Sequence, residues 1–175
     1  MYKKVKVAIC GCEGHVEKFG KLINSYEESE TIAVWDSDLN EAQRVADEIG
    51  NCRVWEDYDA LLNEPELDGV VIVSPAIMHA DMALKAIRAG KHVFVEKPLC
   101  ISAEDAYEVR KAVLENGVKF FMTDLPALLP PKEKVVAALT AFCAACCFPG
   151  LSRARNRAMN GFFIGFIPLL VVEIM

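Results

Sequence analysis

Short apolar runs alternate with amphipathic segments from Val5 to Met122. The runs are rich in valine and isoleucine, which is typical of strands buried in a parallel sheet. The segments between them repeat apolar residues at helical spacing. This order predicts an α/β fold, a Rossmann-type doubly wound parallel sheet with helices on both faces. The predicted strands are Val5–Ile9, Thr31–Trp35, Cys52–Trp55, Asp68–Val73, His92–Val95 and Val118–Met122.

Capping signals set the ends of the helices between these strands. Asp38 begins one helix, with Glu41 at its third position, and Ser102 begins another. Gly50 and Gly117 are expected to end these two helices. Further helical segments are expected at His15 to Ile23, Asp57 to Leu62 and Ile77 to Ala89. The helix after Asp38 is expected to bury a stripe of Leu39, Ala42, Val45, Ala46 and Ile49.

A glycine-containing turn follows the first predicted strand. Gly11, Cys12, Glu13, Gly14 and His15 lie between this strand and a helix, the arrangement that cradles phosphates with backbone amides. Glu13 stands where a second glycine would let the backbone approach a pyrophosphate. By itself the turn is therefore equally an ordinary strand-to-helix connection.

Asp36 favours the nucleotide interpretation of that turn. It ends the second predicted strand, at the spacing from the glycines where an acid accepts hydrogen bonds from a ribose 2′-hydroxyl. Ser37 follows it, where a nearby arginine would accommodate a 2′-phosphate. The pair therefore favours NAD as cofactor and leaves NADP open.

A second candidate site follows the fifth predicted strand. Glu96, Lys97 and Pro98 come directly after Val95, and binding residues of an open parallel sheet lie at such strand ends. Proline fixes the backbone direction and donates no hydrogen bond. A lysine here is in position to meet a ligand's reacting carbon or hydroxyl, whereas most Glu-Lys pairs are solvated surface.

Together these motifs resemble the amino-terminal domain of the Gfo/Idh/MocA oxidoreductases, which include glucose-fructose oxidoreductase and inositol dehydrogenase. The resemblance extends from about Lys4 to Met122. It rests on the glycine turn, Asp36, the segments 57–62 and 68–75, His79 and the segment 89–98. Its most specific part is the Glu-Lys-Pro segment, and its least faithful part is the glycine turn.

The resemblance implies a role for each matching position. Gly11, Cys12, Glu13, Gly14 and His15 would lie beside the pyrophosphate, and Asp36 would bind the adenosine ribose. Ser74, Pro75 and His79 would line the cofactor cleft, with Glu96 and Lys97 near the nicotinamide. Lys97 is the implied catalytic residue, which positions a substrate hydroxyl and assists proton transfer while hydride moves to or from the nicotinamide.

The resemblance stops after Met122, so we expect a Rossmann domain at residues 1–124 and an atypical apolar tail at 125–175. Family members normally continue into a second α/β domain that supplies a histidine for acid-base chemistry. All histidines of this chain, His15, His79 and His92, lie before that point. The expectation is therefore that the second domain is missing and that a small hydroxylated substrate is turned over only if such a domain is supplied.

The tail contains two apolar runs, Val135–Phe148 and Phe162–Met175. Both are shorter than the roughly 20 apolar residues of a membrane-spanning helix, which disfavours a membrane hairpin. Three arginines lie between the runs, but they have no aromatic platform for a nucleic acid. A shifted reading frame after about Glu133 is a third interpretation, because no acidic residue occurs from Lys134 to Val172.

Composition bounds the partners and the compartment. The formal net charge of −6 argues against nonspecific binding of nucleic acid. The start of the chain has no basic-plus-apolar signal segment, and seven irregularly spaced cysteines favour reduced thiols, so a cytoplasmic location is expected. Cys143, Cys146 and Cys147 lack a fourth ligand for structural zinc, and no metal site is expected.

Two functions from different classes remain after this reading. The first is an NAD(P)-binding protein of a nicotinamide-dependent oxidoreductase family, acting on sugar, polyol or related hydroxyl compounds and incomplete as an enzyme. The second is a non-catalytic dinucleotide-binding sensor or scaffold. The Glu96–Lys97 pair favours the first, and the expected absence of the acid-base domain favours the second.

Overall fold

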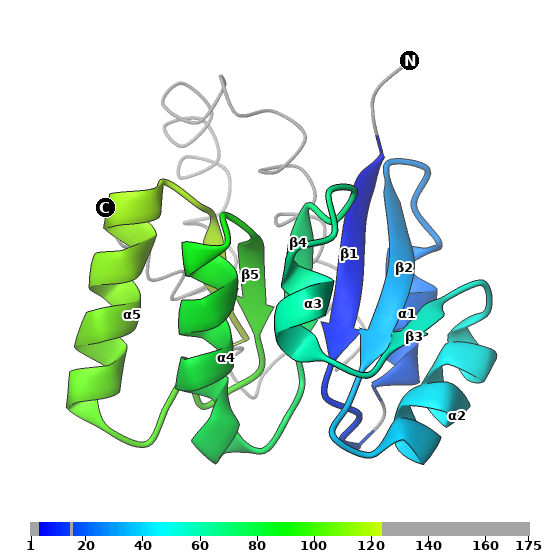
Figure 1. Ribbon diagram of the computed structural model, residues 1–175, viewed down its shortest axis with the longest axis horizontal. Coiled ribbons are helices and arrows are strands. Elements are labelled where there is room, and N and C mark those ends of the chain that lie inside the picture. Colours follow the sequence, from blue (N-terminus) through cyan, green and yellow to red (C-terminus); the bar gives the residue numbers. More distant parts are fainter. Residues whose placement is uncertain (1–3, 15, 124–175) are drawn as a thin grey trace, which may run out of the picture.

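The computed structural model describes residues 4–14 and 16–123, so the predictions for the tail at 125–175 lie outside the described residues. These residues form one parallel six-stranded sheet with the order β3-β2-β1-β4-β5-β6 (Figure 1). The predicted Rossmann-type fold is therefore confirmed. The strands are β1 (Val5–Cys10), β2 (Ser29–Trp35), β3 (Arg53–Trp55), β4 (Gly69–Ile72), β5 (His92–Val95) and β6 (Phe120–Met122).

The strand order reverses between β1 and β4. β1 pairs with β2 on one side and with β4 on the other, so the chain builds the sheet outward in both directions from this point. Ligands of open α/β sheets bind outside the carboxyl ends of the strands at such a switch point. Figure 1 shows the arrowheads of β1 and β2 at the lower edge of the sheet, which we call the carboxyl edge.

Five helices connect the described strands, and side-chain caps begin three of them. The carboxylates of Asp38 and Asp57 accept from the amides of Asn40 and Ala60, and the Ser102 hydroxyl accepts from the amide of Asp105. The helices are α1 (Glu17–Ile23), α2 (Leu39–Ile49), α3 (Tyr58–Leu62), α4 (Ala76–Arg88) and α5 (Ala103–Asn116).

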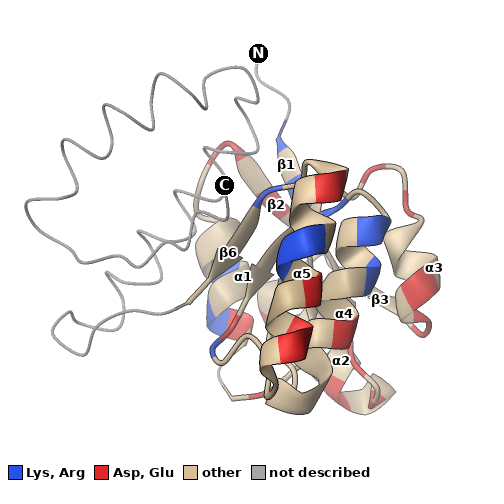
Figure 2. Ribbon diagram, turned by 90° about the vertical axis from the view of Figure 1, so that its left-hand side faces the viewer, with Lys and Arg blue, Asp and Glu red and all other residues tan. Residues whose placement is uncertain are grey.

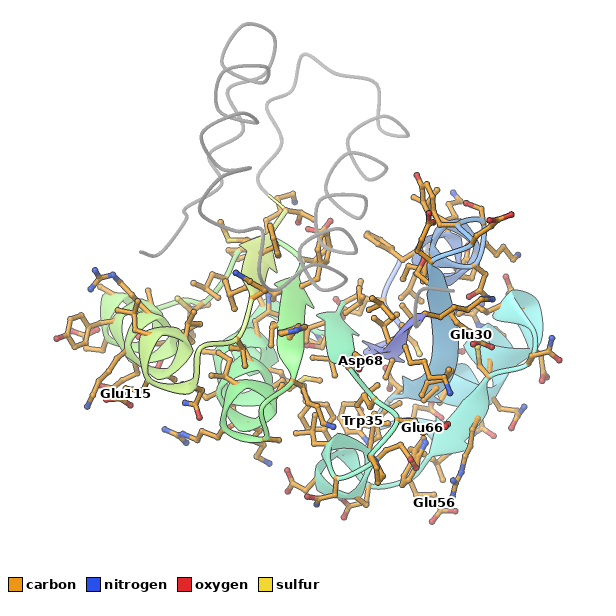
Figure 3. The ribbon with its side chains drawn as sticks, turned by 90° about the horizontal axis from the view of Figure 1, so that it is seen from above. Glu30, Trp35, Glu56, Glu66, Asp68 and Glu115 are labelled. Carbon is orange, nitrogen blue, oxygen red and sulfur yellow. The ribbon has the colours of Figure 1, made fainter. Side chains whose placement is uncertain are left out.

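The core consists of two apolar layers, one on each face of the sheet. One layer contains residues of α3, α4 and α5, and the other contains residues of α1 and α2. Figure 3, seen from above, shows helices on both faces of the strands. β4 is buried along its whole length, as its apolar sequence predicts for a central strand.

The expected buried stripe of α2 is wrong at Leu39. Ala42, Val45 and Ala46 are buried, but the side chain of Leu39 is 44% exposed. Leu39 is the first residue of the helix, and helical side chains point toward the helix amino terminus. The side chain therefore projects past the end of α2 instead of onto the sheet.

Charged groups hold the amino edge of the sheet. The Asp68 carboxylate accepts from the Lys6 amide at 2.9 Å, and the Lys6 ammonium pairs with Glu66 at 2.9 Å. The Lys91 ammonium donates to the carbonyls of Glu64 and Leu67. Asp68 and Glu66 are labelled in Figure 3, which looks onto this edge. These contacts fix the loop before β4 at the amino edge, opposite the carboxyl edge.

The helix surfaces carry both signs of charge. Figure 2 shows acidic and basic residues interspersed over α4 and α5. Arg44 pairs with Glu41 at 2.8 Å and with Glu48 at 2.7 Å along α2, and all three side chains are largely exposed. Exposed pairs of this kind contribute little to stability, so the two apolar layers dominate the energetics of the fold.

Candidate cofactor site

Backbone hydrogen bonds bring four strand ends together at the carboxyl edge. The Gly11 amide donates to the Trp35 carbonyl at 2.8 Å, and the Glu13 amide donates to the Val73 carbonyl at 3.3 Å. The Glu96 amide donates to the Ile72 carbonyl at 2.9 Å. The turns after β1 and β5 are therefore both fixed against their neighbouring strands, on either side of β4.

Gly11 lies very close to the backbone that follows β4. Its φ of +93° is strained for residues with a side chain, and a Cβ atom would lie 2.6 Å from the backbone of Val73 and Ser74. Backbone atoms at that distance cannot move aside as the end of a side chain can. The turn therefore passes directly over the end of β4 because this position has no side chain.

Asp36 connects the end of β2 to the same turn. One carboxylate oxygen accepts from the Cys12 amide at 2.7 Å, and the other accepts from the Asp38 amide at 2.8 Å and the Ser37 hydroxyl at 3.3 Å. These contacts orient Asp36 at the end of β2, beside the turn after β1.

Cys10, the last residue of β1, and Cys12 in the turn both remain neutral thiols near pH 7. Burial is the main cause that raises the pKa of Cys12 to about 12, with the nearby Asp36 carboxylate adding to the effect. Burial also raises the pKa of Cys10, which is fully enclosed. Thiolates are the nucleophilic form of cysteine, so neither residue adds a negative charge or a nucleophile beside the proposed phosphate position.

The glycine turn leads into a shorter helix than the sequence predicts. α1 begins at Glu17, Val16 occupies its cap position without a side-chain hydrogen bond, and Gly14 has a φ of +65°. The left-handed conformation of Gly14 turns the chain before the helix can start. Glu13 is exposed, so its carboxylate extends into solvent, and His15 lies outside the described residues.

The turn after β5 is held by side chains. Glu96 accepts from the Lys97 amide and from the Thr123 hydroxyl, each at 2.6 Å, through the same carboxylate oxygen. The Lys97 amide also lies 2.9 Å from the Thr123 hydroxyl oxygen. The Lys97–Pro98 peptide is cis, and Lys97 is exposed. The backbone of Lys97 is thus fixed while its side chain faces solvent.

His79 reaches both the loop after β4 and the turn after β5. Its Nε2 lies 2.6 Å from the Ser74 carbonyl oxygen and its Nδ1 lies 2.6 Å from the Pro98 carbonyl oxygen. The side chain is 2% exposed, so the ring is enclosed between the two segments. Pro75 is exposed and precedes α4 at the cap position.

The structure brings most of the predicted site residues to one edge. Gly11, Cys12, Glu13 and Gly14 lie in one turn with Asp36 beside them, and Ser74, Pro75, His79, Glu96 and Lys97 lie in the connected segments after β4 and β5. Sequence reasoning missed Thr123, which follows β6 as Glu96 follows β5. That position directly after a predicted strand is the signal that would have found it.

The residues present fit a bound dinucleotide. The Ser74 hydroxyl oxygen is buried and has no hydrogen-bond partner among residues 4–14 and 16–123. The backbone of Ser74 adjoins Gly11, where a Cβ atom would lie 2.6 Å from it. Asp36 lies at the end of the neighbouring strand. A buried polar group without a partner is costly, and a ligand hydroxyl or phosphate would supply one.

Two other kinds of feature are absent from the described part of the chain. Within it, no helix is long and apolar enough to cross a membrane. Nor does it contain a cluster of three or more histidine, cysteine or acidic residues suited to a metal ion.

Comparison with known proteins gives one family. The model described as "Oxidoreductase family, NAD-binding Rossmann fold", the Gfo/Idh/MocA family, matches residues 5–124. Among curated proteins, scyllo-inositol 2-dehydrogenase (NAD(+)) of Bacillus subtilis is 38% identical over 97 residues, which are 55% of this chain and 28% of that protein. The chain therefore spans less than a third of that relative's length.

Solved structures agree with this match. GenD2 from gentamicin A biosynthesis, in complex with NAD, gives a TM-score of 0.66 at 28% identity over 70% of this chain and 35% of its own. A variant of KijD10, a 3-ketoreductase from Actinomadura kijaniata in complex with TDP-benzene and NADP, gives a TM-score of 0.65 at 26% identity, covering 79% of this chain and 44% of its own. The resemblance read from the motifs is thereby confirmed.

Proposed function

Because the chain belongs to the Gfo/Idh/MocA oxidoreductase family, whose domain is an NAD-binding Rossmann fold, we propose that the described residues are the dinucleotide-binding part of a sugar or polyol dehydrogenase. The observation that carries the proposal is the joint placement of Gly11 and Asp36 beside the switch point. A glycine in the tight turn and an acid at the end of the neighbouring strand are the positions that the dinucleotide fingerprint uses, which supports the proposal.

The adenosine half of the cofactor is assigned to the β1–β2 side. The proposed ribose partner is Asp36, and the proposed pyrophosphate neighbours are the backbone groups of Gly11 to Gly14. A carboxylate repels a 2′-phosphate, and Ser37 brings no positive charge to offset it. We therefore propose NAD as the preferred cofactor.

The nicotinamide half is assigned to the β4–β5 side, where Lys97 is the proposed catalytic residue. The cofactor, when bound, supplies hydride exchange with a carbon that carries a hydroxyl or carbonyl group. The Lys97 ammonium would donate a hydrogen bond to that substrate oxygen and stabilise the negative charge that develops on it. Its fixed backbone and exposed side chain support this role.

The substrate class rests on the relatives. Scyllo-inositol 2-dehydrogenase and the D-glucoside 3-dehydrogenase of Escherichia coli are named for a ring hydroxyl of a cyclitol and a sugar. Both match over about a third of their length or less, so the substrate of this chain and the further groups that complete its chemistry are part of the proposal. A cytoplasmic location is also proposed, in keeping with the free thiols of Cys10, Cys12, Cys52 and Cys100.

Fluorescence titration of the full chain with NADH and NADPH tests the proposal. We expect saturable NADH binding that is tighter than NADPH binding and is weakened about tenfold or more by Asp36→Ala, the loss expected for a charged hydrogen bond. Asp57→Ala is the matched control, because Asp57 caps α3 at the end of the outermost strand. Absence of NADH binding by folded wild-type chain would refute the proposal.

A further inference from the structure

His79 occupies a bridging position that its sequence motif does not disclose. It lies in the first turn of α4, and its ring nitrogens face carbonyl oxygens from two different segments. Ser74 belongs to the loop at the switch point, and Pro98 belongs to the turn that carries Lys97. Both contacts are 2.6 Å long, within hydrogen-bond distance.

The protonation state of the imidazole determines how many of these two hydrogen bonds the ring can donate. Carbonyl oxygens only accept hydrogen bonds, so each ring nitrogen must carry a proton to bond to its carbonyl. Neutral imidazole carries one such proton and makes one of the two bonds, whereas the imidazolium makes both. Burial of the ring to 2% exposure excludes water as the replacement partner.

The bridge contacts the chain on the carboxyl side of Lys97. Thr123 and Glu96 bind the Lys97 amide, which precedes the side chain along the backbone. His79 meets the Pro98 carbonyl, which follows it. Lys97 is therefore held from both directions, by β6 through Thr123 and by α4 through His79.

We propose that His79 is a positioning residue that sets the spacing between the loop after β4 and the Lys97 turn, and so shapes the cleft for the nicotinamide half of the cofactor. The inference rests on the proposed function, because it assigns a role to that same site. His79 acts through the Ser74 and Pro98 carbonyls and does not itself touch the cofactor.

Two variants separate the arms of the bridge. Asparagine places an amide nitrogen near the Nδ1 position, so His79→Asn keeps a donor toward Pro98. Glutamine places its amide nitrogen near the Nε2 position, so His79→Gln keeps a donor toward Ser74. His92→Asn is the matched control, because His92 is also hydrogen-bonded to backbone, through Nδ1 to the Lys119 amide, but at the amino edge.

The experiment compares binding of NADH with binding of ADP-ribose, which lacks the nicotinamide, to the full chain. We expect His79→Gln to weaken NADH about tenfold, the loss of about one hydrogen bond, and to leave ADP-ribose unchanged. His79→Asn should weaken NADH less than His79→Gln, and His92→Asn should change neither ligand. General destabilisation would instead weaken both ligands together.

The outcomes separate this inference from the proposed function. Wild-type binding of neither ligand would refute the proposed function and this inference with it. Wild-type binding of both, with His79→Gln binding NADH as wild type does, would overturn the inference alone. Should the variants fail to fold, nitrogen NMR of the wild-type ring decides. Protons on both ring nitrogens support the bridge, whereas a proton on one nitrogen only, or exchange between tautomers, overturns it.

Discussion

The turns after β1 and β5 lie on either side of β4 and are built in opposite ways. The first turn depends on a missing side chain, because Gly11 passes over the backbone of Val73 and Ser74. The second depends on side chains that are present, because Glu96, Thr123 and His79 hold the backbone around Lys97. One is fixed by close packing and the other by a polar network.

Because of this difference, different kinds of substitution should disrupt the two turns. Adding a single methyl group should disrupt the first, because backbone atoms would have to move. The second should tolerate changes in volume but not the loss of a hydrogen-bond donor or acceptor, because Thr123 and His79, which supply these groups, are buried. A change in one turn should therefore weaken binding of the adenosine half or of the nicotinamide half of the proposed cofactor, but not of both.

The largest expected effect follows from filling the space at Gly11. Gly11→Ala adds a Cβ atom 2.6 Å from backbone and imposes an unfavourable φ, so it should lower the free energy of unfolding by at least about 2 kcal/mol. Urea denaturation measures the loss.

Gly14→Ala provides the control for the backbone conformation alone. Gly14 also has a positive φ, but a Cβ there meets nothing within 4 Å among the described residues. Its cost should be about 1 kcal/mol, that of a left-handed residue without a clash. Equal losses for the two variants would contradict the close-packing account of the first turn.

The next effect concerns the polar network of the second turn. Thr123→Val keeps the volume but removes the donor to Glu96 and an acceptor for the Lys97 amide, which should cost about 1–3 kcal/mol of stability. NADH binding should weaken more than ADP-ribose binding.

Thr31→Val is the matched control for this network. Thr31 is also buried, and its hydroxyl donates to the Gly20 carbonyl at 3.3 Å. That carbonyl already accepts from the Asn24 amide, so the variant should cost less and should leave the ratio of the two ligand affinities unchanged. A changed ratio in Thr31→Val would show that the ratio does not report on the Lys97 turn.

The same contrast explains what the sequence reveals. Gly11 and Asp36 could be predicted, because a backbone conformation and a local spacing determine their roles. The contacts of Thr123 with Glu96 and Lys97, and of His79 with Pro98, could not, because these partners are 19 to 27 residues away and meet only in the folded chain. Sequence placed His79 at the site, but not the bridge that it forms.

Strand boundaries show the same limit within the fold. The sequence predicts a strand from Val118, whereas β6 begins at Phe120. Val118 is buried at 8% exposure although it precedes the paired residues. An apolar pattern indicates which residues are buried, not which ones pair with a neighbouring strand. The predicted strand is therefore longer than the segment that pairs with β5.

The smallest expected effect lies at the amino edge, away from both turns. Burial, with a smaller contribution from Lys119, lowers the pKa of His92 from its ordinary 6.5, against an opposing effect of Asp68. The folded state therefore disfavours the protonated ring. Stability from this residue is complete above pH 6.5 and is lost as pH falls through the lowered pKa.

His92→Asn should flatten this part of the pH profile, because asparagine keeps an acceptor for the Lys119 amide and does not titrate. Thermal unfolding followed from pH 7 downward measures the change. A profile that is as steep in the variant as in the wild type would assign the acid sensitivity to groups other than His92.

NMR mapping of the labelled full chain tests the division of the site most directly. NADH should shift the amides of residues 11–14, 36–38 and 96–97, whereas ADP-ribose should shift only the first two groups. Shifts at residues 96–97 with ADP-ribose as large as those with NADH, or shifts confined to the amino edge, would contradict the assignment of separate cofactor halves to the two turns.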